Sequence, residues 1–541
     1  MCGIWFCLGD FCSANYNHYV NKIKGRGPED TMIQTIPKIG TLGFNRLAIN
    51  GLNKEGMQPF SYNGIIWMCN GEIYNWKKLA TIHNITVKSN SDCEVLGHLY
   101  IKFRNDLPTF FKLLDGVFSL IICDTERNKV IIGRDPYGVR PLYMGYNYTH
   151  ISNDHLSKKY FASEIKGLVP LCKNVEVFKP GTYRVFNPST NLCEVDERYH
   201  NIPFLKNPHY NDFFIGATAL RIALESAVEK RLLTERPIAC LLSGGLDSSL
   251  IASLVQRKLK EFNLPSLKTF CIGMPGSTDV EYARKVAHFI KSEHTEIIKT
   301  PQEFLEAIPH VIKDIESYDT TTVRASVGNW LVSKYIKEHT DCKVVFNGDG
   351  SDEIFGSYMY FYNAPNDSEF EAETRRLLND IHYFDVLRSD RSISSHGLEP
   401  RTPFLDRQFV QVALSMPTQY RRPLKGTVPE KNMLRRAFDD GLTLPDEVLW
   451  RKKEAFSDGV SGLEKSWYQI IQENIKVPVT WLEIAKDKYE YCMPTTKEMF
   501  YYRSEFEKHY KGQERVIPYF WMPKWSPGAT DPSARTLNTY F

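Results

Sequence analysis

The sequence is poor in the features that mark membrane, secreted and nucleic-acid-binding proteins. Its 541 residues include 67 Lys and Arg against 64 Asp and Glu, a formal charge of +3, so no basic field for a nucleic acid is present. The longest plainly apolar runs, such as residues 117–123, are far shorter than the ~20 residues that cross a bilayer. The N-terminus lacks the basic and apolar regions of a secretory signal. We therefore expect a cytoplasmic protein that binds neither nucleic acid nor membrane.

Cysteine is present, but in no ligand or disulfide pattern. The twelve cysteines are scattered, without a C-x-x-C pair or a zinc spacing. This excludes a zinc-ribbon type of protein and favours free thiols in a reducing compartment. At 541 residues, with 42% apolar and 13% aromatic side chains, the chain is long enough for about two to four well-buried domains.

The rhythm of the sequence changes near residue 195. Residues 1–195 contain short strand-like runs at 41–44, 65–68, 117–122 and 129–132, separated by turn signals such as Asn63-Gly64 and Asn70-Gly71, with a helix predicted over 92–103. A soft stretch rich in Asn and Pro predicts a linker at 196–212. Residues 213–541 then alternate strand, loop and helix, which predicts a parallel sheet with helices on both faces.

The second residue is a candidate nucleophile. Side chains as small as Cys2 allow removal of Met1, which would place an α-amine and a thiol on one residue. The amine, with an ordinary pKa of about 7.7–8.0, could then accept the proton of a thiol whose pKa is about 8.5. A chain can also begin Met-Cys by chance, so the dipeptide needs support from other motifs.

A loop between a predicted strand and a helix has the chemistry of an anion site. The run Ser243-Gly244-Gly245-Leu246-Asp247-Ser248 offers glycine amides, a helix N-terminus and two hydroxyls. Asp247 suits such a site if it holds Mg²⁺ beside pyrophosphate. The loop is not a Walker A motif, which favours cleavage of ATP to AMP and pyrophosphate over a kinase. A glycine-rich helix cap is the alternative interpretation.

A second loop is expected at the same edge of the sheet. Asn347-Gly348-Asp349-Gly350-Ser351-Asp352-Glu353 follows a predicted strand at 343–346, and the carboxyl ends of parallel strands are where such folds bind ligands. Its three carboxylates could hold Mg²⁺ or steer a cationic group. A solvated acidic turn is the alternative.

Separated motifs agree in their resemblance to one family. Cys2-Gly3-Ile4, Arg46-Leu47-Ala48-Ile49, Asn70-Gly71-Glu72-Ile73-Tyr74-Asn75 and the run from Gly133 to Leu142 resemble N-terminal-nucleophile glutamine amidotransferases. Residues 243–248 resemble the pyrophosphate motif of N-type ATP pyrophosphatases. Their combination in one chain is similar to glutamine-hydrolysing asparagine synthetases, and the likeness extends to the tail at 530–536.

The resemblance implies a fold and a domain division. It implies an α+β, αββα sandwich of the N-terminal-nucleophile hydrolase type at residues 1–195, the linker at 196–212, and an α/β parallel-sheet ATP pyrophosphatase domain at 213–541. It also implies glutamine, aspartate and ATP as substrates, Mg²⁺ with ATP, no organic cofactor, and a homodimer.

The resemblance further assigns roles to residues of the first domain. Cys2 would attack glutamine, and Asn70 with the backbone amide of Gly71 would form the oxyanion hole. Arg46 would bind the α-carboxylate, and Glu72 and Asp92 the amine side. The glutamine-binding set is Arg46, Leu47, Ala48, Ile49, Asn50, Asn70, Gly71, Glu72 and Asp92. Taken alone, Arg46 could instead form a surface ion pair, and Asn70-Gly71 a type I′ hairpin turn.

In the second domain the resemblance implies a nucleotide site and an aspartate site. The ATP-binding set is Leu241, Ser243, Gly244, Gly245, Asp247, Ser248, Ile272, Asn347 and Gly348. Lys453 would neutralise the reacting phosphate. Thr321, Arg324, Asp349 and Asp352 would line the site of the aspartyl intermediate, and Asp247 and Asp352 would hold Mg²⁺ through pyrophosphate.

Two departures from the family pattern stand out. Asn347-Gly348-Asp349-Gly350 replaces the usual Ser-Gly-Glu-Gly, so the carboxylate of Asp349 is one methylene shorter, about 1.5 Å. Lys24-Gly25-Arg26-Gly27-Pro28-Glu29 replaces the usual His-Arg-Gly-Pro-Asp. The alternatives are a synthetase on this scaffold that uses a different carboxylate, and a non-catalytic sensor of glutamine or ATP.

Overall fold

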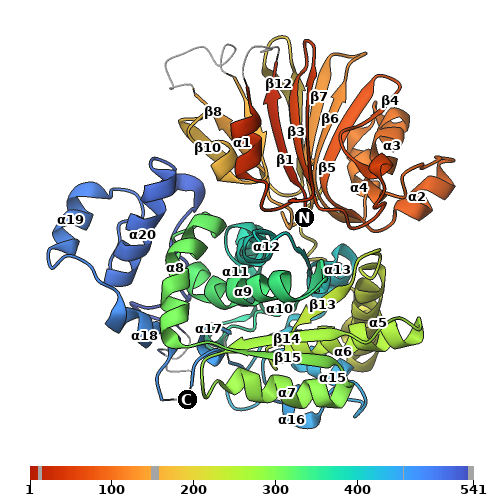
Figure 1. The fold of residues 1–541 in the computed structure, drawn as a ribbon. Helices are drawn as coiled ribbons and strands as arrows, with labels where there is room; N and C mark the ends of the chain where they lie inside the picture. Colours follow the sequence, from red (N-terminus) through yellow and green to blue (C-terminus); the bar gives the residue numbers. More distant parts are fainter. Residues whose placement is uncertain (10–14, 148–157, 455, 463, 534–535, 537–541) are drawn as a thin grey trace.

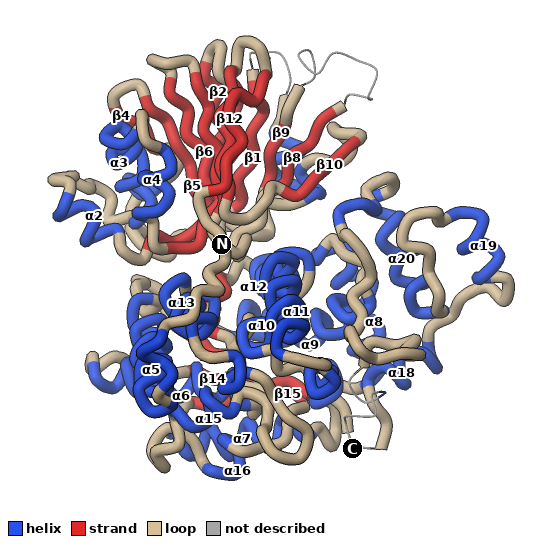
Figure 2. The backbone as a smooth tube through the Cα atoms, turned by 180° about the vertical axis from the view of Figure 1, so that it is seen from behind, coloured by secondary structure: helices blue, strands red, loops and turns tan. Residues whose placement is uncertain are grey.

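The computed structural model describes residues 1–541 except 10–14, 148–157, 455, 463, 534–535 and 537–541. Figure 1 shows two parts stacked on each other. The N-terminal part is rich in β-strands. The larger C-terminal part consists of helices around a central sheet and includes the C-terminus. Figure 2 shows the same two parts from behind. No helix among the described residues is long and apolar enough to cross a membrane.

The N-terminal part is built on two antiparallel sheets of six strands each. Their strand orders are β10-β8-β9-β1-β3-β2 and β12-β11-β7-β6-β5-β4. The strands are β1 Gly3–Leu8, β2 Asp30–Ile36, β3 Gly40–Arg46, β4 Phe60–Tyr62, β5 Ile65–Ile73, β6 Gly116–Asp124, β7 Lys129–Arg134, β8 Tyr143–Tyr146, β9 Tyr160–Ala162, β10 Asn174–Val177, β11 Thr182–Asn187 and β12 Leu192–Arg198.

Alternate residues of the central strands face different apolar cores. In β1, Ile4 and Phe6 lie between the two sheets, whereas Trp5 packs outward with Val20 of helix α1 (Asn17–Lys22). In β5, Trp67 packs outward against helices α2 (Trp76–Ile82), α3 (Val95–Phe103) and α4 (Leu107–Leu113). Both faces of each sheet are therefore covered, which explains why these strands read as continuous apolar runs. This confirms the expected αββα sandwich.

One predicted turn is wrong. Asn63-Gly64 does form the turn between β4 and β5, with positive φ at both residues. Asn70-Gly71, by contrast, lies inside β5, where it pairs with Ser119 and Phe118 of β6. Nine consecutive residue pairs join β5 to β6, so sheet pairing overrides the local turn preference of Asn-Gly.

The C-terminal part is built on five parallel strands in the order β15-β14-β13-β16-β17. β12 ends at Arg198 and α5 begins at Phe213, with a short 3-10 helix at Pro208–Asn211 between them, so the linker predicted at 196–212 begins inside the last three residues of β12. The strands are β13 Ile238–Leu241, β14 Lys268–Gly273, β15 Glu293–Ile298, β16 Val344–Phe346 and β17 Glu399–Arg401.

Helices cover both faces of the parallel sheet, as the sequence predicts. On one face, Cys240 and Phe346 pack with α5, α6, α7 and α13; on the other, Ala239 and Val345 pack with α8, α9 and α12. The helices are α5 Phe213–Lys230, α6 Leu246–Glu261, α7 Thr278–Ile290, α8 Pro301–Ile315, α9 Thr320–His339, α10 Ser351–Phe355, α11 Asp367–Asp380, α12 Asp385–Ser394, α13 Arg407–Ser415, α14 Thr418–Arg421, α15 Asn432–Ala437, α16 Asp446–Leu449, α17 Phe456–Gly459, α18 Trp467–Asn474, α19 Trp481–Lys488 and α20 Lys497–Tyr510.

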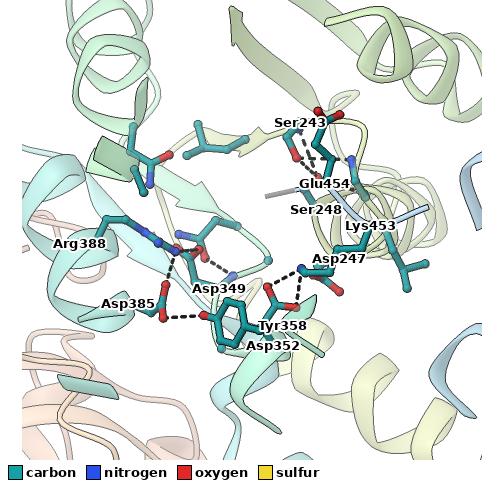
Figure 3. Close-up of a pocket in the computed structure, with 18 of the residues that line it drawn as sticks. Ser243, Asp247, Ser248, Asp349, Asp352, Tyr358, Asp385, Arg388, Lys453 and Glu454 are labelled. Atoms are coloured by element: carbon teal, nitrogen blue, oxygen red, sulfur yellow. Dashed lines mark hydrogen bonds and ion pairs between the residues drawn. The ribbon is translucent and has the colours of Figure 1, made fainter. Parts of the chain in front are cut away.

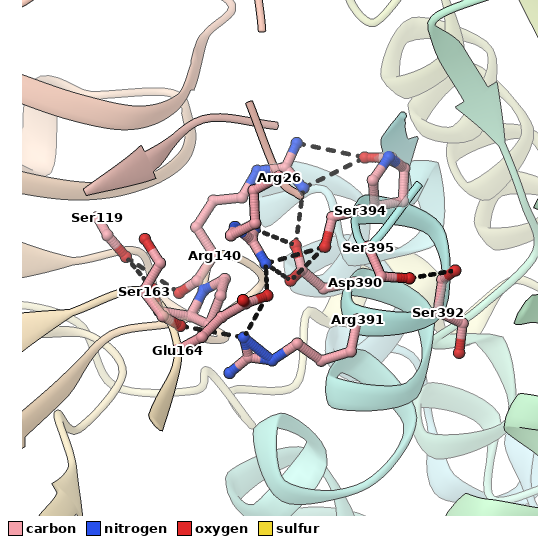
Figure 4. A network of polar contacts seen from close by, with 12 residues as sticks. Arg26, Ser119, Arg140, Ser163, Glu164, Asp390, Arg391, Ser392, Ser394 and Ser395 are labelled. Carbon is pink, nitrogen blue, oxygen red and sulfur yellow. Dashed lines mark hydrogen bonds and ion pairs between the residues drawn. The ribbon is translucent and has the colours of Figure 1, made fainter. Parts of the chain in front are cut away.

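The two parts meet through a network of buried charges. The guanidinium of Arg26 forms ion pairs with Asp390 at 2.7 Å and Glu164 at 3.0 Å, and Nε donates to the carbonyl of Cys2 at 3.1 Å. Arg391 joins the same network, 3.2 Å from Glu164. Figure 4 shows these side chains converging from the N-terminal part and from helix α12. Apolar contact accompanies the charges, because Leu47, Val117 and Val139 share one core with residues of the C-terminal part.

Candidate functional site

The predicted pyrophosphate loop connects β13 to α6. Gly244 has φ +73°, and a Cβ there would lie 2.4 Å from the backbone nitrogen of Ala283. Glycine is therefore required for both conformation and space. The hydroxyls of Ser243 and Ser248 lie 3.0 Å apart across the turn, so the loop presents two hydroxyls and the N-terminus of α6 to one side.

The loop after β16 packs directly on the pyrophosphate loop. A Cβ at Gly348 would lie 2.7 Å from the backbone nitrogen of Ser248, so the two backbones touch. The two loops form one wall of a cavity in the C-terminal part, shown in Figure 3. The predicted residues that line it are Leu241, Ser243, Gly245, Asp247, Ser248, Ile272, Thr321, Asn347, Gly348, Asp349, Asp352 and Lys453. Gly244 is not among the described residues that line the cavity, and its backbone packs against Tyr282 and Ala283.

Two lysines and two carboxylates face each other in the cavity. Lys431 Nζ lies 2.5 Å from Asp247 Oδ2 and 2.6 Å from Asp352 Oδ1, and Lys453 Nζ lies 2.7 Å from Asp352. Burial opposes ionisation of Asp352, but the two lysines outweigh it and hold its pKa below the ordinary value. The ion pairs hold the ammonium of Lys431 at Asp247 of the predicted pyrophosphate loop and that of Lys453 nearby at Asp352, a position that suits pairing with phosphate oxygens.

The carboxylate of Asp349 is held from the opposite wall of the cavity. Arg388 of α12 lies 3.2 Å from Asp349 Oδ1 and 2.5 Å from Asp385, and Asp385 accepts a hydrogen bond of 2.9 Å from Tyr358 (Figure 3). Burial raises the pKa of Asp349, and Arg388 opposes that rise. Asn347 donates to the hydroxyl of Ser389 on the same helix at 2.7 Å. Both residues that depart from the family pattern thus contact α12.

Arg324 lies apart from the other residues assigned to the aspartate site, and its role there stays a prediction. Its guanidinium is buried between Glu498, at 2.6 Å, and Asp531, at 2.7 Å, and it is not among the described residues that line the cavity. Its partners come from 174 and 207 residues further along the chain, which the local motif could not indicate. Thr321, three residues earlier, does line the cavity with a buried hydroxyl that has no partner among the described residues.

Sequence reasoning missed Lys431, Asp385, Arg388 and Tyr358, all of which line the cavity. None belongs to a strand–loop–helix signal. Lys431 precedes the short helix α15, and the other three come from segments that only the tertiary fold brings to the carboxyl edge of the sheet. A positive φ of 57° at Lys431 is a structural sign of constraint, invisible in the sequence.

The predicted nucleophile lies at the start of β1 in the N-terminal part. Cys2 Sγ is 3.6 Å from the carbonyl of Leu47. With Met1 in place, burial raises the pKa of the Cys2 thiol to about 11 and lowers that of the Met1 amine to about 6. In this form the thiol is uncharged at neutral pH, and the role of Cys2 as a nucleophile stays a prediction.

The side-chain amide of Asn70, the predicted oxyanion-hole donor, is fully buried, and neither Nδ2 nor Oδ1 has a hydrogen-bond partner among the described residues. A buried amide without partners costs free energy unless a ligand completes it. At Gly71 a Cβ would lie 2.1 Å from the carbonyl of Val117, so only glycine fits between β5 and β6.

The acidic residues assigned to glutamine lie beside each other and are buried. Asp92 Oδ2 accepts a hydrogen bond of 2.7 Å from the amide of Ile73, and Glu72 Oε2 accepts one of 2.8 Å from Asn50. Burial raises the pKa of Asp92 to about 6 and that of Glu72 well above its ordinary value. Two carboxylates in one buried site suit an ammonium group, because its charge would favour their ionised forms.

The remaining residues of the set surround the segment after β3. The terminal nitrogens of Arg46 donate to the carbonyls of Gly51 at 2.5 Å and Asn53 at 2.9 Å, which fixes the loop that contains Asn50. Each nitrogen has a second N–H group, and binding of a carboxylate by Arg46 stays a prediction. Leu47, Ala48 and Ile49 are buried in this segment.

Fold and sites together define a two-domain class: a glutamine amidotransferase of the N-terminal-nucleophile type joined to an ATP pyrophosphatase domain. The Glutamine amidotransferase domain family model matches residues 1–221, and the Asparagine synthase family model matches 219–373 and 363–531. The chain belongs to the family of glutamine-hydrolysing asparagine synthetases. It is 43% identical to "Asparagine synthetase [glutamine-hydrolyzing]" of Gallus gallus and 42% identical to those of Rattus norvegicus and Homo sapiens, in each case over 100% of this chain and 99% of the relative.

Proposed function

We propose that the chain is a carbon–nitrogen ligase that makes asparagine from aspartate, glutamine and ATP, with glutamate, AMP and pyrophosphate as the other products. The observation that carries this proposal is the cavity in which the Ser-Gly-Gly loop, Asp349, Lys431 and Lys453 meet. Full-length likeness to glutamine-hydrolysing asparagine synthetases supports it.

In the first half-reaction, Cys2 attacks the side-chain amide of glutamine once removal of Met1 has freed its amine. The amine accepts the thiol proton and later returns a proton to the departing ammonia. Asn70 Nδ2 and the Gly71 amide donate to the oxyanion that forms on the former carbonyl oxygen. Water then releases glutamate and regenerates the thiol.

In the second half-reaction, the side-chain carboxylate of aspartate attacks the α-phosphorus of ATP and pyrophosphate leaves. Ser243, Ser248 and the loop amides bind the leaving pyrophosphate, and Lys431 and Lys453 offset its charge. Ammonia then attacks the carbonyl of β-aspartyl-AMP, and AMP leaves. Asp349, close to this carbon in the proposal, is suited to take the proton that ammonia loses.

Mg²⁺ fits the acidic residues of the cavity. No group of three or more His, Cys, Asp or Glu side chains among the described residues could hold a metal by itself, yet Asp247 and Asp352 both converge on the ammonium of Lys431. The proposal therefore assigns Mg²⁺ to ATP, with Asp247 and Asp352 as oxygen ligands and the ion offsetting phosphate charge. No organic cofactor is needed for either half-reaction.

Ammonia needs a protected route between the two half-reactions, because in water near pH 7 it would be mostly protonated. An apolar core supports such a route: Val117, whose carbonyl faces Gly71, belongs to the same core as Leu405, and Leu405 packs against Gly350 beside Asp349. We infer that ammonia crosses along this core.

The cytosol, where thiols such as the free cysteines of this chain stay reduced, is the proposed compartment. A homodimer rests on the family resemblance alone, and sedimentation velocity tests it.

The test compares Cys2→Ala with the wild-type chain. The variant should lose glutamine hydrolysis and glutamine-dependent synthesis, yet keep synthesis from ammonium, because the second cavity is untouched. Cys193→Ala is the matched control, since Cys193 is exposed, and it should behave as wild type. Full glutamine-dependent synthesis by Cys2→Ala would contradict the proposal, and so would the absence of asparagine with either nitrogen source.

A further inference from the structure

One side chain of the C-terminal part ends inside the candidate glutamine site. Arg401 lies on β17, the edge strand of the parallel sheet. Its Nη2 is 3.5 Å from Oε2 of Glu72, which lies on β5 of the N-terminal part. The two side chains are 0% and 4% exposed. Because neither charge contacts water, their interaction is screened little.

The guanidinium of Arg401 is held rigidly. Nε donates to Glu399 Oε1 at 2.9 Å, and Nη1 donates to the carbonyls of Arg231 and, at 2.8 Å, Leu233. These contacts fix the plane of the group, so Nη2 is directed between Glu399 and Glu72 without side-chain motion. The main chain is fixed as well, because the carbonyl of Arg401 accepts a hydrogen bond of 3.1 Å from the amide of Asn347.

The groups around Glu72 have opposite effects on the pKa of its carboxyl group. Burial disfavours its ionised form and raises its pKa; the charges of Asp92, on the 3-10 helix Asp92–Glu94, and of Glu399, on β17, act in the same direction. Arg401, from β17, and Arg140, from the loop after β7, lower the pKa. Asn50 donates to Oε2 at 2.8 Å. Arg401 is the cation that forms an ion pair with Glu72 among the described residues.

We propose that Arg401 is a positioning residue of the glutaminase site, which orients Glu72 to bind the α-ammonium of glutamine. Arg401 does not touch the substrate in this proposal; it acts through Glu72. The glutaminase site is then completed by the synthetase domain. This inference rests on the proposed function, since it needs glutamine as the ligand of Glu72 and Asp92.

The experiment measures glutamate release by the full chain, as KM for glutamine, kcat and pH profile, for wild type, Arg401→Gln and Arg401→Lys. Arg401→Gln should raise KM by about tenfold or more with a smaller change in kcat. The acidic limb of kcat/KM should move up by about one pH unit or more, because loss of a nearby cation shifts a carboxylate pKa by about 1–3 units. Arg401→Lys should restore part of both effects. Arg407→Gln is the matched control: Arg407 also crosses between the parts, donating to the carbonyl of Lys112 at 2.9 Å, and KM should not change.

A double-mutant cycle with Glu72→Gln separates positioning from packing. Once Glu72 carries no charge, the further change of Arg401 to Lys should alter KM and the pH profile little. Additive effects on KM would overturn the inference, and so would an Arg401→Gln chain with wild-type KM and an unmoved acidic limb. If Arg401→Gln fails to fold, KM and the pH profile of Arg401→Lys, alone and combined with Glu72→Gln, still test the inference. A wild-type chain that releases no glutamate would instead contradict the proposed function.

Discussion

Asn70 gives the sharpest residue-scale prediction for the first half-reaction. Its buried side-chain amide has no hydrogen-bond partner among the described residues. Asn70 should therefore donate a hydrogen bond, and lower the free energy of the site, only when the oxyanion forms. Asn70→Ala should reduce the kcat of glutamate release by ~10²–10³, with little change in folding because no existing hydrogen bond is lost. Synthesis from ammonium should stay as in wild type. A decrease of less than about threefold in glutamate release would show that Asn70 is not part of the oxyanion hole.

Asp349 gives the corresponding prediction for the second half-reaction. Asp349→Asn keeps the shape but removes the charge that faces Arg388, and should reduce ammonium-dependent synthesis by ~10² or more. Because burial raises the pKa of Asp349, the ionised form is lost as pH falls through this raised value. Wild-type synthesis should therefore decline on the acid side at a higher pH than an ordinary aspartate would give. Glutamate release by the variant is the control; wild-type synthesis by Asp349→Asn would remove this residue from the mechanism.

Single residues differ in how well the sequence predicts them. Cys2, Asn70 and Asp247 were singled out because they stand in local runs that resemble family motifs, and their roles stay predictions. Lys431 and Arg388 could not be predicted, because each becomes meaningful only where the fold places it against Asp247 or Asp349. The ion pairs of Arg324 with Glu498 and Asp531 could not be predicted either, because both carboxylates lie far along the chain from its motif.

At the scale of elements, the turn from β13 into α6 carries a prediction. Gly244→Ala would place a Cβ 2.4 Å from the amide of Ala283 at a φ of +73°, so the backbone of the pyrophosphate loop must shift. A shift of ~1 Å can cost ~10² in rate. ATP-dependent pyrophosphate release should fall to that extent while glutamate release persists. Gly276→Ala is the control, because its added Cβ meets nothing within 4 Å at a φ of +81°. Equal effects of the two substitutions would show that backbone strain alone is responsible.

Helices and strands with a clear hydrophobic pattern in the sequence were predictable. Those whose extent depends on pairing with a distant strand were not. The strand over 238–242, the following helix and the strand over 268–272 agree with β13, α6 and β14 within a residue or two. The continuation of β5 through Asn70-Gly71 was not predictable, since it depends on Ser119 and Phe118 of β6, 49 and 47 residues further along the chain. The inserted helices α18 to α20 also carry no motif and were not singled out.

At the scale of the whole molecule, the buried ion-pair network between the two parts predicts that removal of one carboxylate, that of Asp390, strongly lowers the free energy of unfolding. Asp390 pairs with both terminal nitrogens of Arg26, at 2.7 and 3.1 Å, and all of these groups are buried. Asp390→Ala should destabilise the chain by about 3–5 kcal/mol, because it leaves a buried cation incompletely compensated. The midpoint of urea unfolding measures this. Glu29→Gln breaks the part-exposed ion pair with Arg236 between the same two parts and should cost at most about 1 kcal/mol. Similar costs for both substitutions would contradict a special role for the Arg26 network.

The proposed function requires that nitrogen pass between two sites in different domains. The direct measurement is one incubation of the wild-type chain with amide-¹⁵N glutamine, aspartate, ATP and Mg²⁺ in an excess of unlabelled ammonium, followed by mass spectrometry of asparagine and AMP. We expect AMP to form in equal amount to asparagine that carries mostly ¹⁵N, because ammonia crosses without mixing with solvent. Glutamate with ¹⁵N-ammonium in solution, and asparagine that carries the solvent's ¹⁴N or is not made at all, would contradict the proposed transfer.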